Sequence, residues 1–320
     1  MEKVIITGAA GFIGSHLSER LLSKNFYVIG FDNLSCSYPK SVYQNTLNLL
    51  RKYKNFYFQN GNILNQKTVS LLIKKQRPDF LIHCAAKTGV RESMISPFIY
   101  TKTNILGTQV LLEALRLYSS KTQTILLSSS SVYGKQDKFP LTEEMIPNPI
   151  SPYGFSKYAM ELLAQQYFGL FKIPIVIIRP FSIYGPRGRF DMAPFLVIKA
   201  AEVGRSFLKY GSDKNNQRDW TYIDDFVDGI IRIVENYPFH SFEVFNLGNE
   251  KPMGIDQFMS ITKRLIKKYL NKELKVIQKP KRDFEMTSNY SSINKAKRIL
   301  KYNPNINFKE GFEKLLQNYA

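Results

Sequence analysis

Short, unbroken apolar runs recur through the first part of the chain, and segments whose apolar residues repeat at helical spacing lie between them. Unbroken apolar runs are typical of strands in a parallel sheet, because helices cover both faces of such a sheet. The pattern predicts strands at residues 3–7, 27–32, 55–60, 80–84, 123–128 and 174–179. It predicts helices at residues 13–23, 67–75, 103–118 and 153–171. We therefore expect an α/β fold built on a doubly wound parallel sheet.

The pattern changes after Arg179. Segments punctuated by Pro and Gly follow at 179–194 and 210–219, and after them come an amphipathic helix at 256–270 and a basic tail. A chain of 320 residues is long enough for two domains. We predict a first domain over residues 1–179, to which a segment at about 221–247 returns. A smaller C-terminal α/β domain is expected over residues 180–320.

Composition excludes several classes of protein. With 44% apolar and 22% charged residues the chain is neither disordered nor fibrous. The two cysteines, Cys36 and Cys84, are too few for a disulfide framework, and neither has a partner at metal-ligand spacing, so no metal site is expected. The N-terminus has no apolar signal segment, and no apolar run is long enough to cross a membrane. These features favour a cytoplasmic protein without a membrane partner.

The chain carries 45 Lys and Arg residues against 26 Asp and Glu residues, a net charge of +19. Such an excess raises the question of an anionic partner. Sixteen of the basic and six of the acidic residues lie between Lys251 and Ala320, so the excess is regional. The basic residues of the helix at 256–270 lie largely opposite its apolar stripe, which indicates a solvated face. No helix-turn-helix, zinc or RNA-binding signature accompanies them, so we expect no nucleic acid partner.

Three glycines, Gly8, Gly11 and Gly14, follow the first predicted strand and open the first helix. Glycines in this place permit a tight turn and let backbone amides approach a pyrophosphate at the helix N-terminus. A purely structural turn can also use glycines at this spacing. The next strand ends in Asp32, where a carboxylate can accept hydrogen bonds from the adenosine ribose hydroxyls. The combination predicts a dinucleotide site and thus the Rossmann form of the doubly wound sheet.

The carboxylate of Asp32 would repel a 2′-phosphate, and no Arg or Lys follows it before Lys40, so NAD is favoured over NADP. By the same reasoning Asn62, just after the third strand, is expected near the adenine edge. The alternative is that Asn62 is an ordinary turn residue.

Tyr153 and Lys157 are four residues apart, on one face of the predicted helix at 153–171. A tyrosine must become a phenolate to abstract a hydroxyl proton, and its free pKa of about 10 is too high for neutral pH. A nearby ammonium and a positive nicotinamide ring can lower that pKa. Such a pair also arises by chance, but a serine-rich segment, Ser128–Gly134, follows the fifth strand at the edge where these sheets carry reactive groups. A serine hydroxyl there can share a proton with substrate and tyrosine.

Together these features resemble the extended short-chain dehydrogenase/reductase family of nucleotide-sugar epimerases and dehydratases. The resemblance covers essentially the whole chain, including the late motif Arg-Asp-Trp-Thr-Tyr-Ile-Asp-Asp at 218–225. It implies NAD as cofactor and a UDP-sugar as substrate, bound by the C-terminal domain. It also implies a homodimer formed through a four-helix bundle of the helices at 103–118 and 153–171.

The resemblance further implies a role for individual residues. Ser129 has the place of the catalytic Ser or Thr, Tyr153 that of the base, and Lys157 that of the group that lowers the tyrosine pKa and binds the nicotinamide ribose. The implied cofactor-binding residues are Gly8, Gly11, Phe12, Ile13, Gly14, Asp32, Asn33, Asn62, Ile63, Ala85, Lys87, Tyr153 and Lys157. The implied substrate-binding residues are Arg91, Ser129, Ser130, Ser131, Tyr153, Ser182, Arg189 and Arg218, with Arg218 on the diphosphate.

The branches of this family share hydride removal from C4 of the sugar and differ in the fate of the resulting keto sugar. Dehydratases carry an Asp-Glu pair just before Val-Tyr-Gly, where this chain has Ser130 and Ser131. Decarboxylases of nucleotide sugars usually keep a Glu at the position of Ser131. Without these acids no group for elimination is evident, so the expected outcome is return of the hydride to the other face of the sugar. The sequence therefore predicts an NAD-dependent 4-epimerase, an isomerase.

Segments 184–193 and 89–93 resemble the UDP-glucuronate 4-epimerase branch, in which Arg189 and Ser182 would hold the C6 carboxylate of the sugar. A 4-keto uronic acid loses CO₂ readily when its carboxylate bond aligns with the carbonyl π system. Preorganised donors from Arg189, Ser182 and the two serines at 130–131 would hold the carboxylate out of that alignment. The alternative for Arg189 is a surface ion pair with Asp191.

Three residues depart from that branch. Phe190 stands where Pro is usual, Lys87 where Gln is usual, and Arg282 in place of a Gly before Asp283. A UDP-glucose or UDP-N-acetylglucosamine 4-epimerase is therefore the first alternative, ahead of a UDP-glucuronate decarboxylase or a sugar dehydratase. A non-catalytic NAD-sensing regulator would be expected to lose Tyr153 or Lys157, and this chain keeps both.

Overall fold

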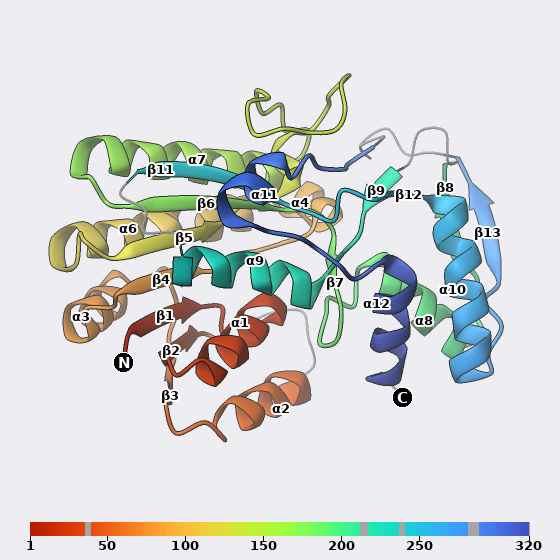
Figure 1. Ribbon diagram of the computed structural model, residues 1–320, viewed down its shortest axis with the longest axis horizontal. Helices are drawn as coiled ribbons and strands as arrows, with labels where there is room; N and C mark the ends of the chain where they lie inside the picture. Colours follow the sequence, from red (N-terminus) through yellow and green to blue (C-terminus); the bar gives the residue numbers. More distant parts are fainter. Residues whose placement is uncertain (36–39, 212–216, 237–240, 281–287, 320) are drawn as a thin grey trace. The chain divides into compact units, whose positions relative to one another are not determined.

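The structure is a computed structural model that describes residues 1–35, 40–211, 217–236, 241–280 and 288–319 (Figure 1). Cys36, Arg282 and Asp283 lie outside the described residues. The chain forms two compact units. The first consists of Met1–Gly134, Met145–Arg179 and Ile230–Phe245, and the second of Lys135–Glu144, Pro180–Gly229 and Asn246–Ala320.

A seven-stranded sheet in the order β11-β6-β5-β4-β1-β2-β3 is the centre of the first unit. Its strands are β1 (Lys3–Thr7), β2 (Tyr27–Asp32), β3 (Phe56–Asn60), β4 (Phe80–His83), β5 (Gln123–Leu127), β6 (Ile175–Pro180) and β11 (Phe242–Leu247). The pairs from β3 through to β6 are parallel. The predicted doubly wound parallel sheet is thus confirmed, and each of the six predicted strands ends within one residue of its predicted bounds. The strand order reverses direction at β1, which puts the crevice for a ligand beside the end of this strand.

Helices cover both faces of this sheet (Figure 1). They are α1 (Phe12–Ser23), α2 (Lys40–Leu50), α3 (Gln66–Gln76), α4 (Val90–Ile95), α5 (Pro97–Tyr100), the π-helix η1 (Thr101–Leu106), α6 (Gly107–Tyr118), the 3₁₀ turn η2 (Ser130–Val132) and α7 (Pro152–Phe171). The second half of α9 (Ile223–Asn236) also belongs to this unit. On one face Ile5, Ile29 and Leu81 pack with residues of α3, α6 and α7 in a single buried cluster. Alternate strand residues point to the opposite face, which α1 and α2 cover.

The helix predicted at 103–118 is divided. Its first turns are the π-helix η1, and regular α-helix starts at Gly107. Asn104 of η1 is buried, and its side-chain amide donates to the Lys87 carbonyl at 3.0 Å and to Ser156 Oγ at 2.8 Å. Its Oδ1 accepts from the Lys87 amide at 2.8 Å. The hydrogen bonds of a π-helix join residues five positions apart, so the side chains are shifted from the α-helical register. Such segments are frequent at functional sites. Here it ties the loop after β4 to the start of α7.

The second unit contains short strands and helices around an aromatic core. Its elements are β7 (Ile183–Tyr184), α8 (Ala193–Glu202), β8 (Phe207–Tyr210), β9 (Gln217–Asp219), β10 (Thr221–Tyr222), the first half of α9, β12 (Pro252–Gly254), α10 (Ile255–Leu270), β13 (Val276–Lys279), α11 (Asn294–Leu300) and α12 (Phe308–Gln317). The strands pair as β10-β7, β12-β9 and β13-β8. Trp220 stacks on Phe258 with ring centroids 5.2 Å apart, and Phe308 packs on both rings.

Residues 135–144 belong to the second unit, although the sequence places them within the first predicted domain. Leu141 exchanges backbone hydrogen bonds with this unit, since its amide donates to the Tyr290 carbonyl and its carbonyl accepts from Ser292. The side chain of Asn246 also donates to the Leu141 carbonyl at 3.0 Å. These bonds join residues more than a hundred positions apart, and local sequence patterns carry no sign of them.

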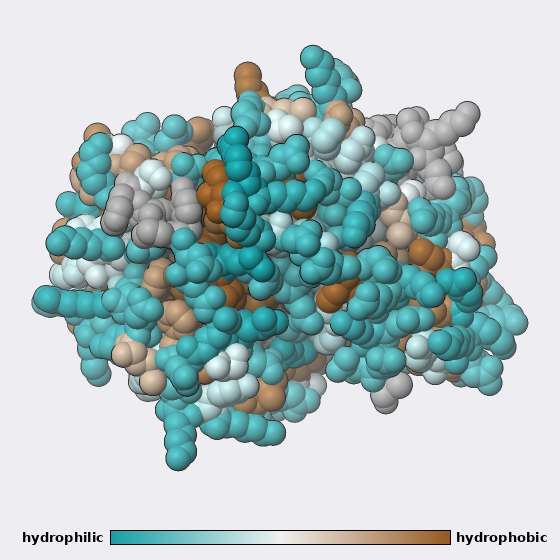
Figure 2. Space-filling view, in the orientation of Figure 1, coloured by the Kyte–Doolittle hydropathy of each residue, from teal (hydrophilic) through white to brown (hydrophobic). Residues whose placement is uncertain are grey.

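The amphipathic helix predicted at 256–270 is α10. Phe258, Leu265 and Ile266 are buried, and Lys263, Arg264, Lys267 and Lys268 are exposed. Where α10 reaches the face drawn in Figure 2, the surface is mostly hydrophilic. The basic residues of this helix therefore form a solvated face, as expected. Within the described part of the chain, the helices are too short or too polar to cross a bilayer.

Candidate active site

The turn between β1 and α1 has the geometry of a phosphate-binding loop. Gly8 has a φ of 71°, and a Cβ there would lie 2.7 Å from the Ala85 amide nitrogen. A Cβ on Gly14 would collide with the Gly8 carbonyl oxygen, so the loop closes only with glycine at both places. Gly11 is the N-cap of α1 and offers no side chain to its first amides. Those amides and the positive end of the helix dipole are left for an anion.

Asp32 ends β2 beside this loop. Its carboxylate accepts from the Ala10 amide at 3.0 Å and from the Leu34 amide at 2.8 Å. Burial raises the pKa of Asp32, and these backbone hydrogen bonds oppose the rise by favouring the ionised form. The two bonds orient the carboxylate and leave further lone pairs for a ligand.

The other predicted cofactor residues lie on loops at the carboxyl ends of the strands. Asn62 Oδ1 accepts from the Leu64 amide at 2.9 Å, so the side-chain carbonyl closes a turn. Asn33 does the same for Ser35. Ile63 is buried, and the Ala85 amide donates to Thr7 Oγ1. Phe12 and Ile13 form the first turn of α1, and the backbone of Lys87 is held by Asn104. All of these positions lie in the first unit.

Tyr153 and Lys157 lie in the first two turns of α7. The helix begins with Pro152, and the hydroxyl of Ser151 caps it by accepting from the Gly154 amide. Both side chains face inward, with exposures of 8% for Tyr153 and 3% for Lys157. Lys157 Nζ donates to the Leu127 carbonyl at 2.6 Å, at the carboxyl end of β5. Thus the predicted pair lies side by side on one face of α7, at the reactive edge of the sheet.

The serine segment packs directly on this part of α7. A Cβ on Gly154 would lie 2.5 Å from the Ser131 carbonyl oxygen, so only glycine lets the helix come this close. Ser129 is the N-cap of η2, and its Oγ accepts from the Ser131 amide at 3.1 Å. This bond uses a lone pair and leaves the hydroxyl hydrogen to donate elsewhere. Ser128 differs, because its hydroxyl donates to the buried carboxylate of Glu161.

Burial and two neighbouring groups, Cys84 and Glu161, shift the pKa of Lys157. Burial lowers the pKa of Lys157 to about 8, while Cys84 and Glu161 act to raise it. Burial also raises the pKa of Cys84 to about 12, so this thiol carries no charge at neutral pH. Burial lowers the pKa of His83 to about 3, with a smaller lowering by Lys157, so the imidazole is neutral as well. With that thiol neutral, the Glu161 carboxylate is a charged neighbour that favours the ammonium form of Lys157.

The sequence patterns did not reveal several residues near this site. Tyr100 packs edge-on against Tyr153 with ring centroids 6.1 Å apart, and its hydroxyl donates to the Thr88 carbonyl. Asn104 joins the β4 loop to Ser156, and Glu161 pairs with Arg179 of β6. For Glu161 a signal exists: residues 153, 157 and 161 repeat every four positions, on one face of a helix.

Three predicted substrate residues lie in the second unit. Ser182 has a φ of 36°, in the left-handed region that non-glycine residues rarely adopt, and its carbonyl accepts from the Thr221 amide. Strained backbone of this kind often marks a functional position. Arg189 Nε and Nη2 donate to the two carboxylate oxygens of Asp191 at 3.0 and 2.5 Å. Arg218 lies in β9, where its Nη1 donates to the Gln217 carbonyl at 2.9 Å. The ion pair weighed as the alternative for Arg189 is thus formed.

The remaining predicted substrate residues lie in the first unit. Arg91 is in the first turn of α4 and is exposed. Ser130 is buried and Ser131 half-buried, both within η2. The structure therefore brings the three serines together with Tyr153 and Lys157, while Arg91 lies in α4, the helix that follows β4.

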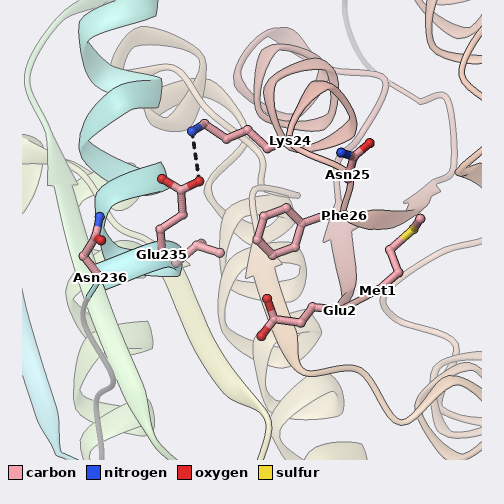
Figure 3. A pocket seen from close by; sticks show the side chains of 8 residues that line it. Met1, Glu2, Lys24, Asn25, Phe26, Glu235 and Asn236 are labelled. Atoms are coloured by element: carbon pink, nitrogen blue, oxygen red, sulfur yellow. Dashed lines mark ion pairs between the residues drawn. The ribbon is translucent and has the colours of Figure 1, made fainter.

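A pocket of about 560 Å³ lies elsewhere in the first unit (Figure 3). It is lined by residues just before β1 and β2 and at the end of α9, including Glu2, Phe26 and Asn236. These positions are at the amino ends of the strands, and the catalytic groups are at the carboxyl ends. The ion pair of Lys24 and Glu235, at 2.9 Å, lies across this pocket. The pocket is therefore separate from the candidate active site.

A sheet of this order, with a glycine turn after β1, a carboxylate at the end of β2 and a buried Ser–Tyr–Lys group beside β5, defines a short-chain dehydrogenase/reductase. The comparison with family models narrows this class. The model described as GDP-mannose 4,6 dehydratase matches residues 5–315, and the chain belongs to this family.

Individual relatives are similar over the whole chain. A UDP-glucuronate 4-epimerase of Thermodesulfobacterium geofontis is 36% identical over 312 residues, which cover 97% of this chain and 94% of the relative. A crystal structure of UDP-glucuronic acid 4-epimerase from Bacillus cereus, in complex with UDP-glucuronic acid and NAD, has a TM-score of 0.91 and 34% identity, covering 99% and 98% of the two chains. UDP-glucose 4-epimerase from Thermotoga maritima, with UDP-glucose, has a TM-score of 0.87 and 28% identity, with the same coverage.

Proposed function

We propose that this protein is an NAD-dependent 4-epimerase that interconverts UDP-glucuronate and UDP-galacturonate through a 4-keto intermediate. The observation that carries the proposal is the serine segment. It keeps a hydroxyl, Ser129, beside the buried Tyr153 and Lys157, and it has serines at 130 and 131 where dehydratases have an acid pair. The similarity to the epimerases of T. geofontis and B. cereus supports the same reaction.

The first unit fits NAD. The turn at Gly8 and Gly14 leaves no room for a Cβ, and the uncapped start of α1 suits the pyrophosphate. Asp32 suits the two ribose hydroxyls and would repel a 2′-phosphate. Lys157 would hold the nicotinamide ribose, and Asn62 would lie near the adenine through the part of its amide that the turn does not use. NAD, when bound, takes up a hydride from C4 of the sugar and gives it back.

The residues of this chain move the proton that accompanies that hydride. Tyr153, as the phenolate, accepts the proton of the C4 hydroxyl and later returns it to the C4 oxygen. Lys157 lies one helical turn away and stabilises the phenolate. Ser129, whose hydroxyl hydrogen is left to donate, bridges the substrate oxygen and Tyr153. Each of these three groups contacts the C4 oxygen or the Tyr153 phenolate that accepts its proton. Loss of any one of them therefore affects the chemical step.

The outcome after oxidation depends on what else can act on the keto sugar. Elimination of water needs an acid and a base near C5 and C6, and the serines at 130 and 131 are neither at ordinary pH. The keto sugar therefore keeps its substituents until it rotates in the site and is reduced on its opposite face. This favours epimerisation over dehydration.

The sugar carboxylate is the part of the substrate that needs restraint. We assign Arg189 and Ser182 to it, with Arg218 on the diphosphate, because a guanidinium binds an anion through two parallel hydrogen bonds. In the structure the Asp191 carboxylate accepts both hydrogen bonds from the Arg189 guanidinium. The substrate carboxylate therefore has to displace Asp191 from this position. Of the residues assigned to the substrate, Ser182, Arg189 and Arg218 belong to the second unit, and Arg91 and the serines at 129–131 belong to the first.

A homodimer also belongs to the proposal. Large apolar side chains are exposed along α4, α5, η1 and α7, among them Ile95, Phe98, Leu106, Phe155, Leu162 and Leu170. Exposed apolar surface on this scale is typical of an interface. A second copy that packs α6 and α7 into a four-helix bundle would cover it, and sedimentation of the protein at micromolar concentration tests this.

We place the enzyme in the cytoplasm, where thiols such as Cys84 stay reduced.

One observation favours a second candidate, a 4-epimerase of UDP-glucose or UDP-N-acetylglucosamine. The ion pair with Asp191 already satisfies Arg189, and Phe190, beside it, packs on Phe195 instead of offering the usual Pro. A neutral sugar would leave that pair intact. The similarity to the T. maritima UDP-glucose enzyme agrees with either substrate.

Separate incubations with UDP-glucuronate, UDP-glucose and UDP-N-acetylglucosamine, followed by NMR, distinguish these candidates. We expect UDP-galacturonate from the first and no pentose. A pentose product would indicate decarboxylation, and turnover of the neutral sugars alone would assign the second candidate. Tyr153→Phe serves as the inactive control in each case.

A further inference from the structure

A buried ion pair lies behind the candidate active site. Arg179 of β6 donates to both carboxylate oxygens of Glu161 on α7, from Nε at 3.0 Å and from Nη2 at 2.7 Å. Both side chains are only 5% exposed. Burying two charges costs as much as their attraction returns, so a buried pair is weak support for stability. The other contacts of the two side chains therefore indicate the role of the pair.

Those contacts lead to both ends of the serine segment. The Ser128 hydroxyl donates to Glu161 Oε1, and Arg179 Nη1 donates to the Tyr133 hydroxyl at 3.0 Å. The guanidinium carbon also lies 4.8 Å from the centre of the Tyr133 ring. Ser128 and Tyr133 are the residues that flank Ser129–Val132. The pair thus fixes the segment from which the Ser129 hydroxyl projects.

The same carboxylate lies one helical turn from Lys157, at position i+4 on α7. Lys157 is surrounded by Tyr153 on its own helix, by His83 and Cys84 at the end of β4, and by the Leu127 carbonyl of β5. His83 and Cys84 are neutral, because burial disfavours the charged form of each. Burial opposes the charge of Arg179, but the hydrogen bonds that it donates to Glu161 raise its pKa, so the guanidinium stays charged and the pair stays formed.

We infer that Glu161 and Arg179 form a positioning unit for the reaction, which holds the Ser129 segment in place and puts a carboxylate one helical turn from Lys157. The inference rests on the proposed function, because it assigns the pair to the same proton-transfer group. Neither residue touches the substrate. Both act through Ser128, Tyr133 and Lys157.

Two variants separate the two parts of this role. Glu161→Gln removes the charge and keeps a side chain that can still meet Arg179 and Ser128. The double variant Glu161→Leu with Arg179→Met replaces the pair by apolar groups of similar size, an exchange that proteins often tolerate without loss of stability. Glu235→Gln is the matched control, since it breaks the ion pair with Lys24 at the opposite end of the sheet (Figure 3).

The pKa of Lys157 is the readout that needs no substrate. Lysine labelled with ¹³C at Cε gives an NMR signal for Lys157, assigned by its loss in Lys157→Met, and the purified protein is titrated with NAD added. In Glu161→Gln both the lost carboxylate and the unbalanced Arg179 lower the pKa of Lys157, by about one unit or more. The alkaline limb of the kcat profile for UDP-glucuronate moves to lower pH by the same amount. The double variant loses its anchors at both ends of the segment, so kcat falls about tenfold or more with little change in KM.

The result that overturns the inference is a Lys157 titration in Glu161→Gln that coincides with those of wild type and Glu235→Gln. A kcat in the double variant equal to that of wild type overturns the part that concerns the serine segment. A third outcome is that Glu161→Gln shifts the Lys157 titration but the wild-type protein turns over none of the UDP-sugars. This result would refute the proposed function and leave the electrostatic part of the inference standing.

Discussion

Replacing Lys157 by methionine should make this protein more stable and inactive at once. Lys157 is fully enclosed in the fold, and burial lowers its pKa from 10.5 to about 8. A group whose pKa falls on folding opposes folding whenever it is protonated. This destabilisation has its full size below about pH 8. It decreases as the pH rises toward 10.5, the pKa of the lysine in the unfolded chain. Methionine has a similar length and carries no charge.

The size of the effect follows from the shift. A change of one pKa unit corresponds to about 1.4 kcal/mol, so the shift of Lys157 amounts to about 3 kcal/mol at pH 6. The variant also loses the hydrogen bond from Nζ to the Leu127 carbonyl, and a buried carbonyl left without its donor costs about 1 kcal/mol. The net gain is about 2 kcal/mol at pH 6, a rise of a few degrees in Tm for a chain of this size.

Thermal unfolding of the purified proteins without cofactor, recorded between pH 6 and 9.5, measures this gain. We expect the Tm difference between Lys157→Met and wild type to be positive at pH 6 and to shrink steadily above pH 8. Lys24→Met, which removes an exposed lysine paired with Glu235, should show no such trend. A Lys157→Met protein that is less stable than wild type at pH 6, or whose Tm difference does not change with pH, would refute the reasoning.

Three further predictions concern the site. Tyr153→Phe should lower kcat by about 10²–10⁴-fold and leave Tm nearly unchanged, because it removes only the proton-transfer oxygen; a smaller loss would argue against Tyr153 as the base. Gly14→Ala should weaken NAD binding by about tenfold or more in calorimetry, since its Cβ collides with the Gly8 carbonyl and overpacking of this kind costs roughly 1–3 kcal/mol. Asp191→Asn should lower KM for UDP-glucuronate about two- to fivefold and leave KM for UDP-glucose alone, because it frees the Arg189 guanidinium from an exposed ion pair worth up to about 1 kcal/mol. Equal changes for both sugars would separate Arg189 from carboxylate recognition.

The sheet and the cofactor loop were predictable because their signals are local. Each parallel strand is an unbroken apolar run, and the turn at Gly8–Gly14 needs glycine whatever surrounds it. Tyr153 and Lys157 were recognised for the same reason, since four residues on a helix always bring two side chains to one face.

The features that the sequence did not reveal depend on contacts between distant segments. The spacing of residues 153, 157 and 161 puts Glu161 on the face of Tyr153 and Lys157, but its buried pairing with Arg179, 18 positions away, has no local signal. The π-helical turn at Asn104 is invisible for a similar reason, because its hydrogen bonds run to Lys87 and Ser156. The transfer of residues 135–144 to the second unit likewise rests on backbone bonds to Tyr290 and Ser292.

The direct test of the proposed reaction is the fate of the hydrogen on C4. UDP-glucuronate deuterated at C4 is incubated with the purified enzyme, and the product is examined by NMR and mass spectrometry. The mechanism predicts UDP-galacturonate that keeps the deuterium at C4, because the same hydride leaves and returns. Loss of the label to solvent, or a pentose in place of the uronic acid, would contradict it.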